Sequence, residues 1–422
     1  MSAFDRIIGY DAIKEEMKLL CDCWRNSDKY KRLGGKPPHG LLLFGDPGLG
    51  KTLFATCLIE ECGLPAITVR KDKSNGAFLD ELKIAFDEAK ENAPSVLLLD
   101  DLDKFTNDSS EGRRDADEYV AVQAGMDATA DCGVFVVATV NSRWKLPESL
   151  VRAGRFDVEI ELKTPSLHDT EKIMRHYLAG KGFDLDCDDL KEFAGIMVEN
   201  SCADVESVVN RAAIYAVYDG RDSVIKDDLI RACLRRFFHA PDGADRYTPA
   251  TRSRIAYHEA GHAIVADVLE PGSVNLISIK ATEGFTGGTV SYRKHPDYLH
   301  RLHYQENRVR VLLAGRTATE LVYGEVDLGS ASDVFRAMHV LRRFRDDYVA
   351  FGFENYVDQF TPEAAKTDAH HRMMQEPEKY CREAKKILID HRAYLDAVAK
   401  ELLEKETLLG CDLVRIRRAV EG

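Results

Sequence analysis

The feature that most constrains the fold is a glycine-rich segment, GDPGLGKT, at Gly45–Thr52. It matches the pattern G-x-x-x-x-G-K-[ST] in full, and it follows the apolar run Leu41–Phe44 and precedes a stretch with helical spacing. A strand, a glycine loop and a helix in this order form the first unit of a parallel α/β sheet. The pattern therefore predicts a phosphate-binding α/β module in the first part of the chain.

The residue types of this segment follow from the chemistry of phosphate binding. Glycines allow backbone N–H groups to curl around phosphate oxygens, and the next helix presents its positive end to them. We expect Lys51 to neutralise the β- and γ-phosphates and the Thr52 hydroxyl to ligate Mg²⁺. The residues expected to contact ATP are Gly45, Asp46, Pro47, Gly48, Leu49, Gly50, Lys51 and Thr52.

Two later apolar segments are expected to be buried strands that end in polar residues. Ser95–Asp103 (SVLLLDDLD) places Asp100 to hold the water shell of the metal and Asp101 to polarise the attacking water. Asn141 follows the strand candidate Val134–Thr139, where its amide can orient the water or touch the γ-phosphate. A lone asparagine at such a place is, however, more often a turn former. Strands that alternate with helices predict a mostly parallel sheet with helices on both faces.

Two arginines three residues apart, Arg152 and Arg155, lie in LVRAGRFD just after this sheet. They cannot easily reach the nucleotide of their own chain. They suit contact with the γ-phosphate of a neighbouring subunit, as an arginine finger does. The alternative is that both are solvated surface side chains. The finger interpretation predicts an oligomer.

Periodicity and composition divide the chain into four regions. Residues 1–165 form the predicted nucleotide-binding domain, and residues 166–239 are expected to be helices only, as a helical lid. The segment APDGADRYTPA, with two prolines and a glycine, is the predicted linker at 240–250. Residues 251–422 are expected to be mainly helical, with one interrupted β-like segment around Leu276–Tyr292.

The last region contains an H-E-x-x-H motif, HEAGH, at His258–His262. On a helix, two histidines at i and i+4 lie on one face and can share a zinc ion. Glu259 projects beside them as a candidate general base toward the attacking water. A pattern of this length also arises by chance, and paired helix histidines are often only structural. The helical context favours a zinc peptidase site.

Two histidines need a third protein ligand, and sequence spacing alone does not select it. Asp333 has the attraction that Ser332-Asp333 opens an amphipathic helix, where a carboxylate is held rigidly. The candidates are Asp267, Glu270, His295, His300, His303, Asp327, Asp333 and His339.

Composition argues against two other classes of protein, namely nucleic-acid-binding proteins and membrane-spanning proteins. The formal net charge of −13 disfavours a nucleic-acid partner, because phosphate binding needs a concentrated positive surface. The apolar runs are well below the roughly 18–20 residues that cross a bilayer, which predicts no membrane span. The 10 cysteines include no Cys-x-x-Cys pair and fit reduced thiols in the cytoplasm.

In this order, the motifs resemble the FtsH family of AAA+ zinc proteases, from about Phe4 to the C-terminal helices. The most specific segments are FDRIIGYDAIKEE, LGGKPPHGLLLFGDPGLGKT, FDEAKENAPSVLLLDDLD, LVRAGRFD, RIAYHEAGHAIV, LLAGRTATELVYG and LGSASDVFRA. The resemblance implies an α/β AAA+ module with a helical lid, followed by a mainly α-helical zincin-type peptidase domain. It also implies that Asp333 is the third zinc ligand and Asn141 the sensor. Arg152 and Arg155 would be the fingers that act in trans.

The same resemblance implies a homohexamer that uses ATP to feed unfolded protein substrates into an internal proteolytic chamber. Several features depart from the family pattern. The membrane-spanning N-terminus of the family is not found in this sequence. Asp101 stands where the family has a glutamate, and Cys202 replaces a glycine in the segment that resembles the second nucleotide sensor.

The pore loop departs from the family as well. Ser74-Asn75-Gly76 aligns with the expected aromatic-apolar-glycine triplet, and Phe78 is interpreted as a helix-core residue. We therefore predict cleavage of unfolded or loosely folded proteins and poor degradation of stable ones. The alternatives are an ATP-gated peptidase with weak threading and a non-proteolytic AAA+ remodeller. A remodeller offers no chemical reason for two helix histidines beside a glutamate.

Overall fold

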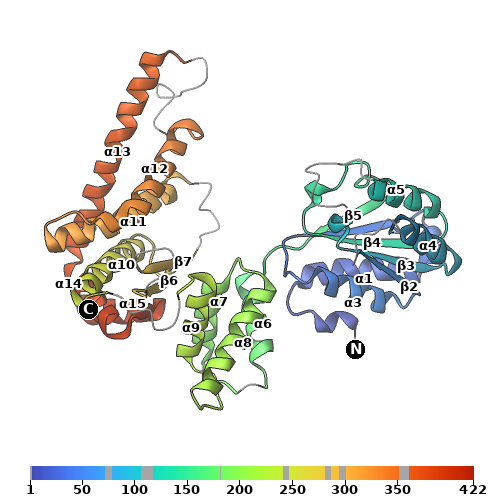
Figure 1. Ribbon diagram of the computed structural model, residues 1–422, viewed down its shortest axis with the longest axis horizontal. Coiled ribbons are helices and arrows are strands. Elements are labelled where there is room, and N and C mark those ends of the chain that lie inside the picture. Colours follow the sequence, from blue (N-terminus) through green and yellow to red (C-terminus); the bar gives the residue numbers. More distant parts are fainter. Residues whose placement is uncertain are drawn as a thin grey trace. The chain divides into compact units, whose positions relative to one another are not determined.

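The computed structural model describes residues 2–71, 78–105, 117–180, 182–240, 247–280, 287–293, 301–350 and 361–422. The chain divides into two compact units, whose elements are labelled in Figure 1. The first comprises Met1–Lys181 and Met197–Asn210, and the second comprises Gly182–Ile196 and Arg211–Gly422. The division therefore crosses two helices, and each unit is described by itself.

The first unit is built on a parallel sheet, as the sequence predicted. Its strand order is β2-β3-β4-β1-β5. The strands are β1 (Gly40–Phe44), β2 (Ala66–Arg70), β3 (Ser95–Asp100), β4 (Val134–Val140) and β5 (Phe156–Glu161). Every residue of β3 and β4 is buried, because helices cover both faces. The loops that follow β1, β3 and β4 meet at the carboxyl edge of the sheet, where open α/β sheets bind ligands.

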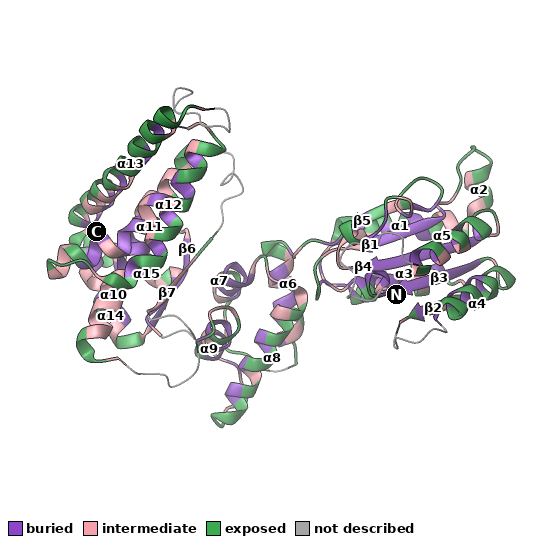
Figure 2. Cartoon of the chain, turned by 45° about the horizontal axis from the view of Figure 1, so that its top comes forward, coloured by how far each residue is buried: buried purple, intermediate pink, exposed green. Residues whose placement is uncertain are grey.

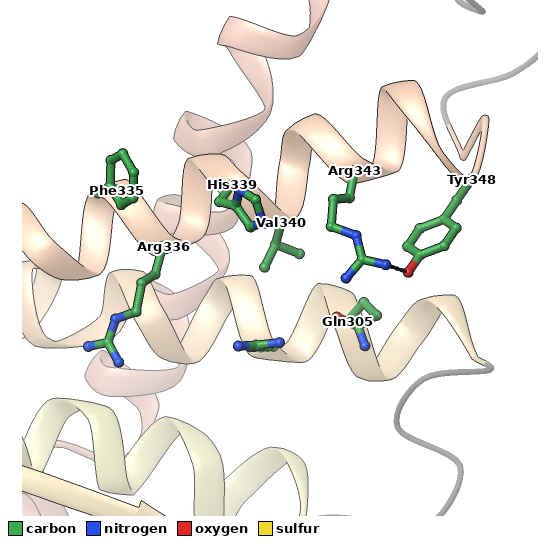
Figure 3. A pocket seen from close by; sticks show the side chains of 8 residues that line it. Gln305, Phe335, Arg336, His339, Val340, Arg343 and Tyr348 are labelled. Atoms are coloured by element: carbon green, nitrogen blue, oxygen red, sulfur yellow. Dashed lines mark hydrogen bonds between the residues drawn. The ribbon is translucent and has the colours of Figure 1, made fainter. Parts of the chain in front are cut away.

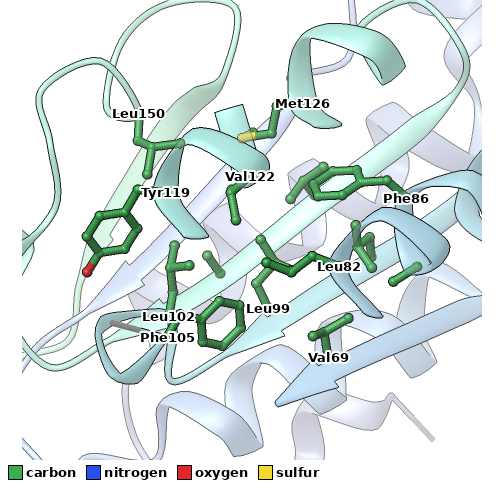
Figure 4. Packing of buried hydrophobic residues seen from close by; sticks show 14 of the residues in the cluster. Val69, Leu82, Phe86, Leu99, Leu102, Phe105, Tyr119, Val122, Met126 and Leu150 are labelled. Carbon is green, nitrogen blue, oxygen red and sulfur yellow. The ribbon is translucent and has the colours of Figure 1, made fainter. Parts of the chain in front are cut away.

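Two apolar cores lie on the two faces of this sheet. On one face pack η1 (Ala3–Arg6), α1 (Asp11–Arg25) and α3 (Lys51–Cys62), and the short α2 (Ser27–Lys31) follows α1. The other face is covered by α4 (Phe78–Glu91) and α5 (Asp117–Thr129), whose side chains surround Leu99 of β3 (Figure 4). Short 3-10 turns follow β3 and β4, namely η2 (Leu102–Lys104) and η3 (Arg143–Lys145). Colouring by burial shows the same contrast between buried strands and half-exposed helices (Figure 2).

In the described part of residues 166–239, four helices follow the first sheet, in agreement with the helical pattern of the sequence. They are α6 (Leu167–Leu178), α7 (Cys187–Met197), α8 (Cys202–Tyr218) and α9 (Lys226–Phe237). Ser166 caps α6 by accepting a hydrogen bond from the Asp169 N–H group. One isolated parallel bridge joins Phe183 to Val224 in the described part of this region.

The part of the second unit that follows α9 is mainly helical, as predicted for residues 251–422. Its described helical segments are α10 (Pro249–Leu269), α11 (Leu302–Tyr323), η4 (Leu328–Ser330), α12 (Ala331–Asp346), α13 (Glu363–Asp390), α14 (Arg392–Lys405) and α15 (Gly410–Glu421). Thr248 caps α10 and Pro249 opens it, so this helix begins inside the segment predicted as a linker. α10 and α11 approach closely at Gly261, where a β-carbon would lie 2.5 Å from Ala318 Cβ.

A small antiparallel sheet with the order β7-β6-β8 completes the second unit. The strands β6 (Val274–Ser278) and β7 (Thr289–Tyr292) are the interrupted β-like segment that the sequence predicted. The third strand, β8 (Thr407–Leu409), was not predicted. It lies between two helices, and three residues are too few to show an alternating pattern.

Within the second unit, α7 and α9 contact the small sheet and α15. The buried Asn275 of β6 donates its amide to the Gly195 carbonyl of α7 at 3.1 Å. The Cys411 N–H group donates to Glu192 Oε1 at 2.6 Å. Lys226 of α9 also donates to the Cys411 sulfur at 3.6 Å. These contacts tie part of the lid region to the second unit.

Candidate functional site

The glycine-rich segment forms the loop between β1 and α3. Gly45, Gly48 and Gly50 have φ angles of 145°, 82° and 89°, which residues with a β-carbon rarely adopt. A β-carbon on Gly45 would also lie 2.1 Å from the Leu162 carbonyl oxygen. Gly50 precedes the first helical residue and provides no side-chain cap. The N–H groups of the first turn of α3 are therefore available to a phosphate.

Lys51 places its ammonium group in this loop. Its Nζ donates to the carbonyl oxygens of Gly45 at 2.7 Å and Asp46 at 3.0 Å, and to Asn141 Oδ1 at 2.9 Å. Burial lowers the pKa of Lys51, and nearby carboxylates, with Asp101 the strongest, act in the opposite direction. The structure thus brings together two side chains that the sequence proposed from separate patterns.

Asp100, at the end of β3, is buried beside the phosphate loop. Its Oδ1 accepts hydrogen bonds from the Thr52 hydroxyl at 3.0 Å and the Thr139 hydroxyl at 2.7 Å. Thr52 and Asp100 were both predicted to serve Mg²⁺, and oxygen atoms of these types suit that ion. Thr139 was not predicted. It reaches Asp100 because β4 pairs with β3 in parallel register.

Asp101 follows in a left-handed conformation with φ of 57°. Its N–H group donates to the Thr139 hydroxyl at 2.8 Å. Its carboxylate pairs with Lys104 at 2.8 Å and with Arg70 at 3.4 Å. The carboxylate that was predicted to polarise water is therefore engaged by two cations.

Asp103 is a buried site residue to which the sequence analysis assigned no role. Its Oδ2 accepts the Asn141 N–H at 3.2 Å, and its Oδ1 has no partner among the described residues. The carboxylate thus holds the backbone of Asn141 while Lys51 holds its side chain. The run of acids that ends SVLLLDDLD was the feature that could have indicated this role.

The two candidate finger arginines have different surroundings. Arg155 is buried, and its guanidinium donates to both carboxylate oxygens of Asp127 at 2.9 and 2.8 Å and to the Ser149 carbonyl. Arg152 is exposed. Within the chain, Arg155 is therefore a structural side chain, while Arg152 is open to a partner.

The start of α8 reaches the phosphate loop. The Ala203 N–H donates to the Gly48 carbonyl at 3.1 Å, and a β-carbon on Gly48 would lie 2.7 Å from the Ser201 hydroxyl. The neighbouring Cys202, which departs from the family pattern, lies with its sulfur 3.5 Å from the Tyr10 hydroxyl. The segment that resembles the second nucleotide sensor is thus in contact with the nucleotide loop.

The HEAGH motif lies on α10, and Asp333 of α12 joins its two histidines. The Nε2 atoms of His258 and His262 lie 3.1 Å apart, and Asp333 Oδ2 lies 3.2 and 3.4 Å from them. In a tetrahedral zinc site with ligand bonds of about 2.0–2.2 Å, neighbouring ligand atoms are roughly 3.3 Å apart. The three atoms therefore fit a zinc ion. Among the described residues, this is the group of metal-ligating side chains close enough to share an ion.

Surrounding groups orient these ligands. His262 Nδ1 lies 2.6 Å from the Val311 carbonyl oxygen of α11, so Nδ1 carries the proton and Nε2 faces the cluster. Gly315 of α11 leaves the space that the rings occupy, because a β-carbon there would lie 2.4 Å from His262 Nε2. Neither residue was predicted. A backbone carbonyl has no sequence pattern, and only the glycine inside a helical segment could have indicated a close approach.

The Asp333 carboxylate is held in its charged form. Burial alone would raise its pKa, but hydrogen bonds to His258 and His262 hold the pKa of Asp333 well below its usual range. Arg336, one turn further along α12, pairs with its other oxygen, Oδ1. Oδ2 is left facing the two histidines.

Glu259 lies beside the cluster and is 6% exposed. Burial raises the pKa of Glu259 to about 7, while His258 and the Gly288 N–H group oppose the rise. Gly288 packs tightly here, because a β-carbon on it would lie 2.7 Å from Glu259 Cγ. A carboxyl group with a pKa near neutrality can both accept and donate a proton.

Other candidates from the sequence lie elsewhere. Asp267 is buried with Arg417 at 3.0 Å and the Tyr394 hydroxyl at 3.2 Å, so it has a structural role. Asp267 is not a member of the metal-ligand cluster of His258, His262 and Asp333. His295, His300 and the pore segment Ser74-Asn75-Gly76 lie outside the described residues. The remaining candidates do not join the cluster of described ligands: Glu270, His303, Asp327 and His339.

Phe78 tests the interpretation of the segment after the pore loop. It begins α4, is 3% exposed and packs edge-on against Phe105 with ring centroids 4.8 Å apart. Its interpretation as a core residue is confirmed.

Two family models match the chain in the places that these sites occupy. The ATPase family associated with various cellular activities (AAA) matches residues 41–164, and Peptidase family M41 matches residues 246–381. The fold and the two sites thus define an ATPase of the AAA class joined to a zinc metallopeptidase.

Curated relatives extend over both parts. The ATP-dependent zinc metalloprotease FtsH 1 of Thermomicrobium roseum is 30% identical over 446 residues, which cover 97% of this chain and 67% of that protein. FtsH 2 of Symbiobacterium thermophilum is also 30% identical, over 99% of this chain and 74% of its own length. The chain belongs to the FtsH family of ATP-dependent zinc metalloproteases.

The chain is accordingly an ATP-dependent zinc metalloprotease that uses Zn²⁺ and ATP with Mg²⁺. Membership of the AAA family indicates oligomeric assembly. In the described residues, no helix combines the length and the apolar character needed to cross a membrane.

Proposed function

We propose that the chain is an endopeptidase for unfolded or loosely folded proteins, and that it cleaves them at the cluster formed by His258, His262 and Asp333. The observation that carries this proposal is a buried carboxyl group, Glu259, directly beside three converging ligand atoms. Zinc held by these three residues supplies a Lewis acid, which polarises a carbonyl and makes water more acidic. This donor set leaves room for substrate, as catalytic zinc sites do.

Glu259 acts as the general base and then as the general acid. Its carboxylate takes a proton from the attacking water, and the carboxyl group so formed, which burial favours, gives that proton to the leaving amine. The Gly288 N–H group helps to hold the carboxylate in place. The Val311 carbonyl positions His262, and Arg336 positions Asp333.

ATP hydrolysis is assigned to the edge of the large sheet. Lys51 neutralises the phosphates, and Thr52 with Asp100 holds Mg²⁺. Asp101 polarises the attacking water. To do so, its carboxylate must either leave its ion pair with Lys104 or bind the water while it keeps that pair. Asn141 senses the γ-phosphate through its contact with Lys51.

The oligomer is proposed to be a homohexamer, in which Arg152 reaches the nucleotide of the neighbouring subunit. Its exposure supports this role. Arg155 is proposed to act at the same interface only if it exchanges its bidentate contact with Asp127 for the phosphate. Without that exchange, it supports the loop that presents Arg152.

The proposed domains are residues 1–165 for nucleotide binding, 166–239 for the lid, 240–250 for the linker and 251–422 for the peptidase. We also propose a cytoplasmic location for this catalytic part, which the nine free thiols among the described cysteines support.

The test is casein cleavage by the wild type and by Glu259→Gln, each with ATP. Glu259→Gln is expected to retain one zinc per chain and to lose about 10²–10⁴-fold in rate, because the base is removed and the ligands are not. Glu404→Gln, an exposed site on α14, is the matched control and should behave as the wild type. Cleavage by Glu259→Gln at the wild-type rate would refute the assignment of the base.

A further inference from the structure

A cavity of about 450 Å³ lies between α11 and α12 (Figure 3). Its lining includes the end of Arg336, whose guanidinium also pairs with Asp333 of the metal-ligand cluster. The side chains of Arg336 and Arg343 extend from α12 toward α11, and Gln305 of α11 lies opposite Arg343 (Figure 3). The cavity therefore begins next to the proposed cleavage site.

The lining of this cavity is cationic. Its charged and aromatic members are Arg308, Phe335, Arg336, His339, Arg343 and Tyr348, and no carboxylate lines it among the described residues. The charge of Arg343 is balanced by Asp347 at 2.9 Å. Arg308 is exposed and has no acidic partner in the described part of the chain. A metal ion bound by Asp333 would share the negative charge of its carboxylate with Arg336. The positive charge of Arg336 would then be less fully neutralised.

The spacing along α12 matches the length of a bound peptide. Asp333 and Arg343 are ten residues apart, so they are separated by about 15 Å along the helix axis. An extended chain rises roughly 3.3 Å per residue, so about four to five substrate residues span the same distance. A substrate that crosses the metal cluster along α12 therefore places its residues two to five positions from the cleaved bond over the cavity.

We propose that this cavity is a substrate subsite for the side-chain carboxylate of an aspartate or glutamate, two to five residues from the cleaved bond. The proposal rests on the proposed function of the metal cluster. Arg308 and Arg336 donate charge-assisted hydrogen bonds to the carboxylate, which are stronger than neutral ones. Phe335, 68% exposed, contacts the apolar part of the same side chain.

The experiment uses the full chain with ATP and fluorogenic peptides that contain one cleavable bond. Aspartate is placed at each position from two to five residues on either side of this bond, and each peptide has a partner with asparagine at that position. All termini are acetylated or amidated, so the side chain supplies the only carboxylate that differs. The wild type is expected to cleave the aspartate peptide at its best position with a kcat/KM about tenfold above that of the asparagine peptide, mainly through KM.

Two variants assign this preference to the cavity. For Arg308→Gln, the kcat/KM of the aspartate peptide divided by that of the asparagine peptide is expected to be close to one. Arg308→Glu is expected to cleave a peptide with lysine at the same position better than the aspartate peptide. The control is Arg382→Gln, which removes the same charge from an exposed site on α13 that does not line the cavity. It should retain the wild-type ratio. Zinc content and thermal unfolding of each variant establish that it is folded and loaded.

The outcomes separate this subsite from the cleavage site itself. Equal cleavage of both peptides at every position would overturn the subsite and leave the protease assignment intact. An aspartate preference that survives Arg308→Gln unchanged would also overturn it. If the zinc-loaded wild type cleaves none of the peptides and no casein, the proposed cleavage site fails, and the subsite fails with it.

Discussion

Replacing Gly315 with alanine is expected to disable the metal cluster through steric overlap alone. The added carbon on α11 would lie 2.4 Å from His262 Nε2 and 2.7 Å from His258 Cε1. Atoms in ordinary contact are about 3.5–4.0 Å apart, so either the rings or the helices must move by about 1 Å. Neither can move easily. His262 is held by Val311, and α10 already touches α11 closely at Gly261.

The size of the effect follows from this displacement. A misplacement of about 1 Å at reacting groups can cost roughly 10²-fold in rate, so we expect at least that loss in peptide hydrolysis together with weaker zinc binding. The stability of the fold should change less. Alanine favours a helix over glycine by about 1 kcal/mol, which opposes an overpacking cost of about 1–3 kcal/mol.

The assay measures zinc per chain after dialysis against buffered zinc, hydrolysis of an uncharged peptide, and thermal unfolding of the same samples. Gly329→Ala is the matched control, because a β-carbon there would meet only Asp327 Oδ1 at 3.5 Å. It should retain zinc and activity. A Gly315→Ala protein that binds one zinc with wild-type affinity and cleaves at the wild-type rate would refute the steric argument.

Three further predictions concern ATP hydrolysis. Mixing Arg152→Ala subunits with Lys51→Ala subunits should restore part of the ATPase activity that each variant lacks alone, because Arg152 acts on the nucleotide of the neighbouring subunit. No recovery at any mixing ratio would contradict this role. Arg155→Ala should lower the midpoint of thermal unfolding as well as activity, since it leaves the Ser149 carbonyl and Asp127 without their donor, and an unchanged midpoint would show that the contact is dispensable. Asp101→Glu should speed ATP turnover, because its longer side chain reaches beyond the pair with Lys104; equal or slower turnover in steady-state assays would show that the aspartate is already placed to act.

The parts of this chain that could be predicted from sequence are those that depend on local spacing. The phosphate loop has a fixed motif between a strand and a helix, and the two histidines of HEAGH need only one helical turn to meet. Asp333 lies 75 residues from His258, and spacing could not select it from eight candidates. Its position depends on how α12 packs against the rest of the peptidase unit, which only resemblance could indicate in advance.

The residues that sequence reasoning missed act through shape or through the backbone. Gly315 contributes empty space, and Val311 contributes a carbonyl oxygen that every residue has. Thr139 was read as the end of an apolar strand, and its role arises from the register of β3 and β4. The contact of Arg155 with Asp127 could not be read from the pattern either, because the two residues lie 28 positions apart in sequence.

The contacts of α7 with β6 and α15 have a consequence for anyone who wishes to dissect this chain. On sequence grounds, the predicted linker at 240–250 is the natural place to cut, but a fragment that starts there lacks Gly195 and Glu192. The buried amide of Asn275 would lose its acceptor, at a cost of about 1–3 kcal/mol for an unpaired buried donor. The peptidase half should therefore be produced with residues 182–240 attached, so that the contacts of α7 with β6 and α15 are kept in proteolytic and biophysical experiments.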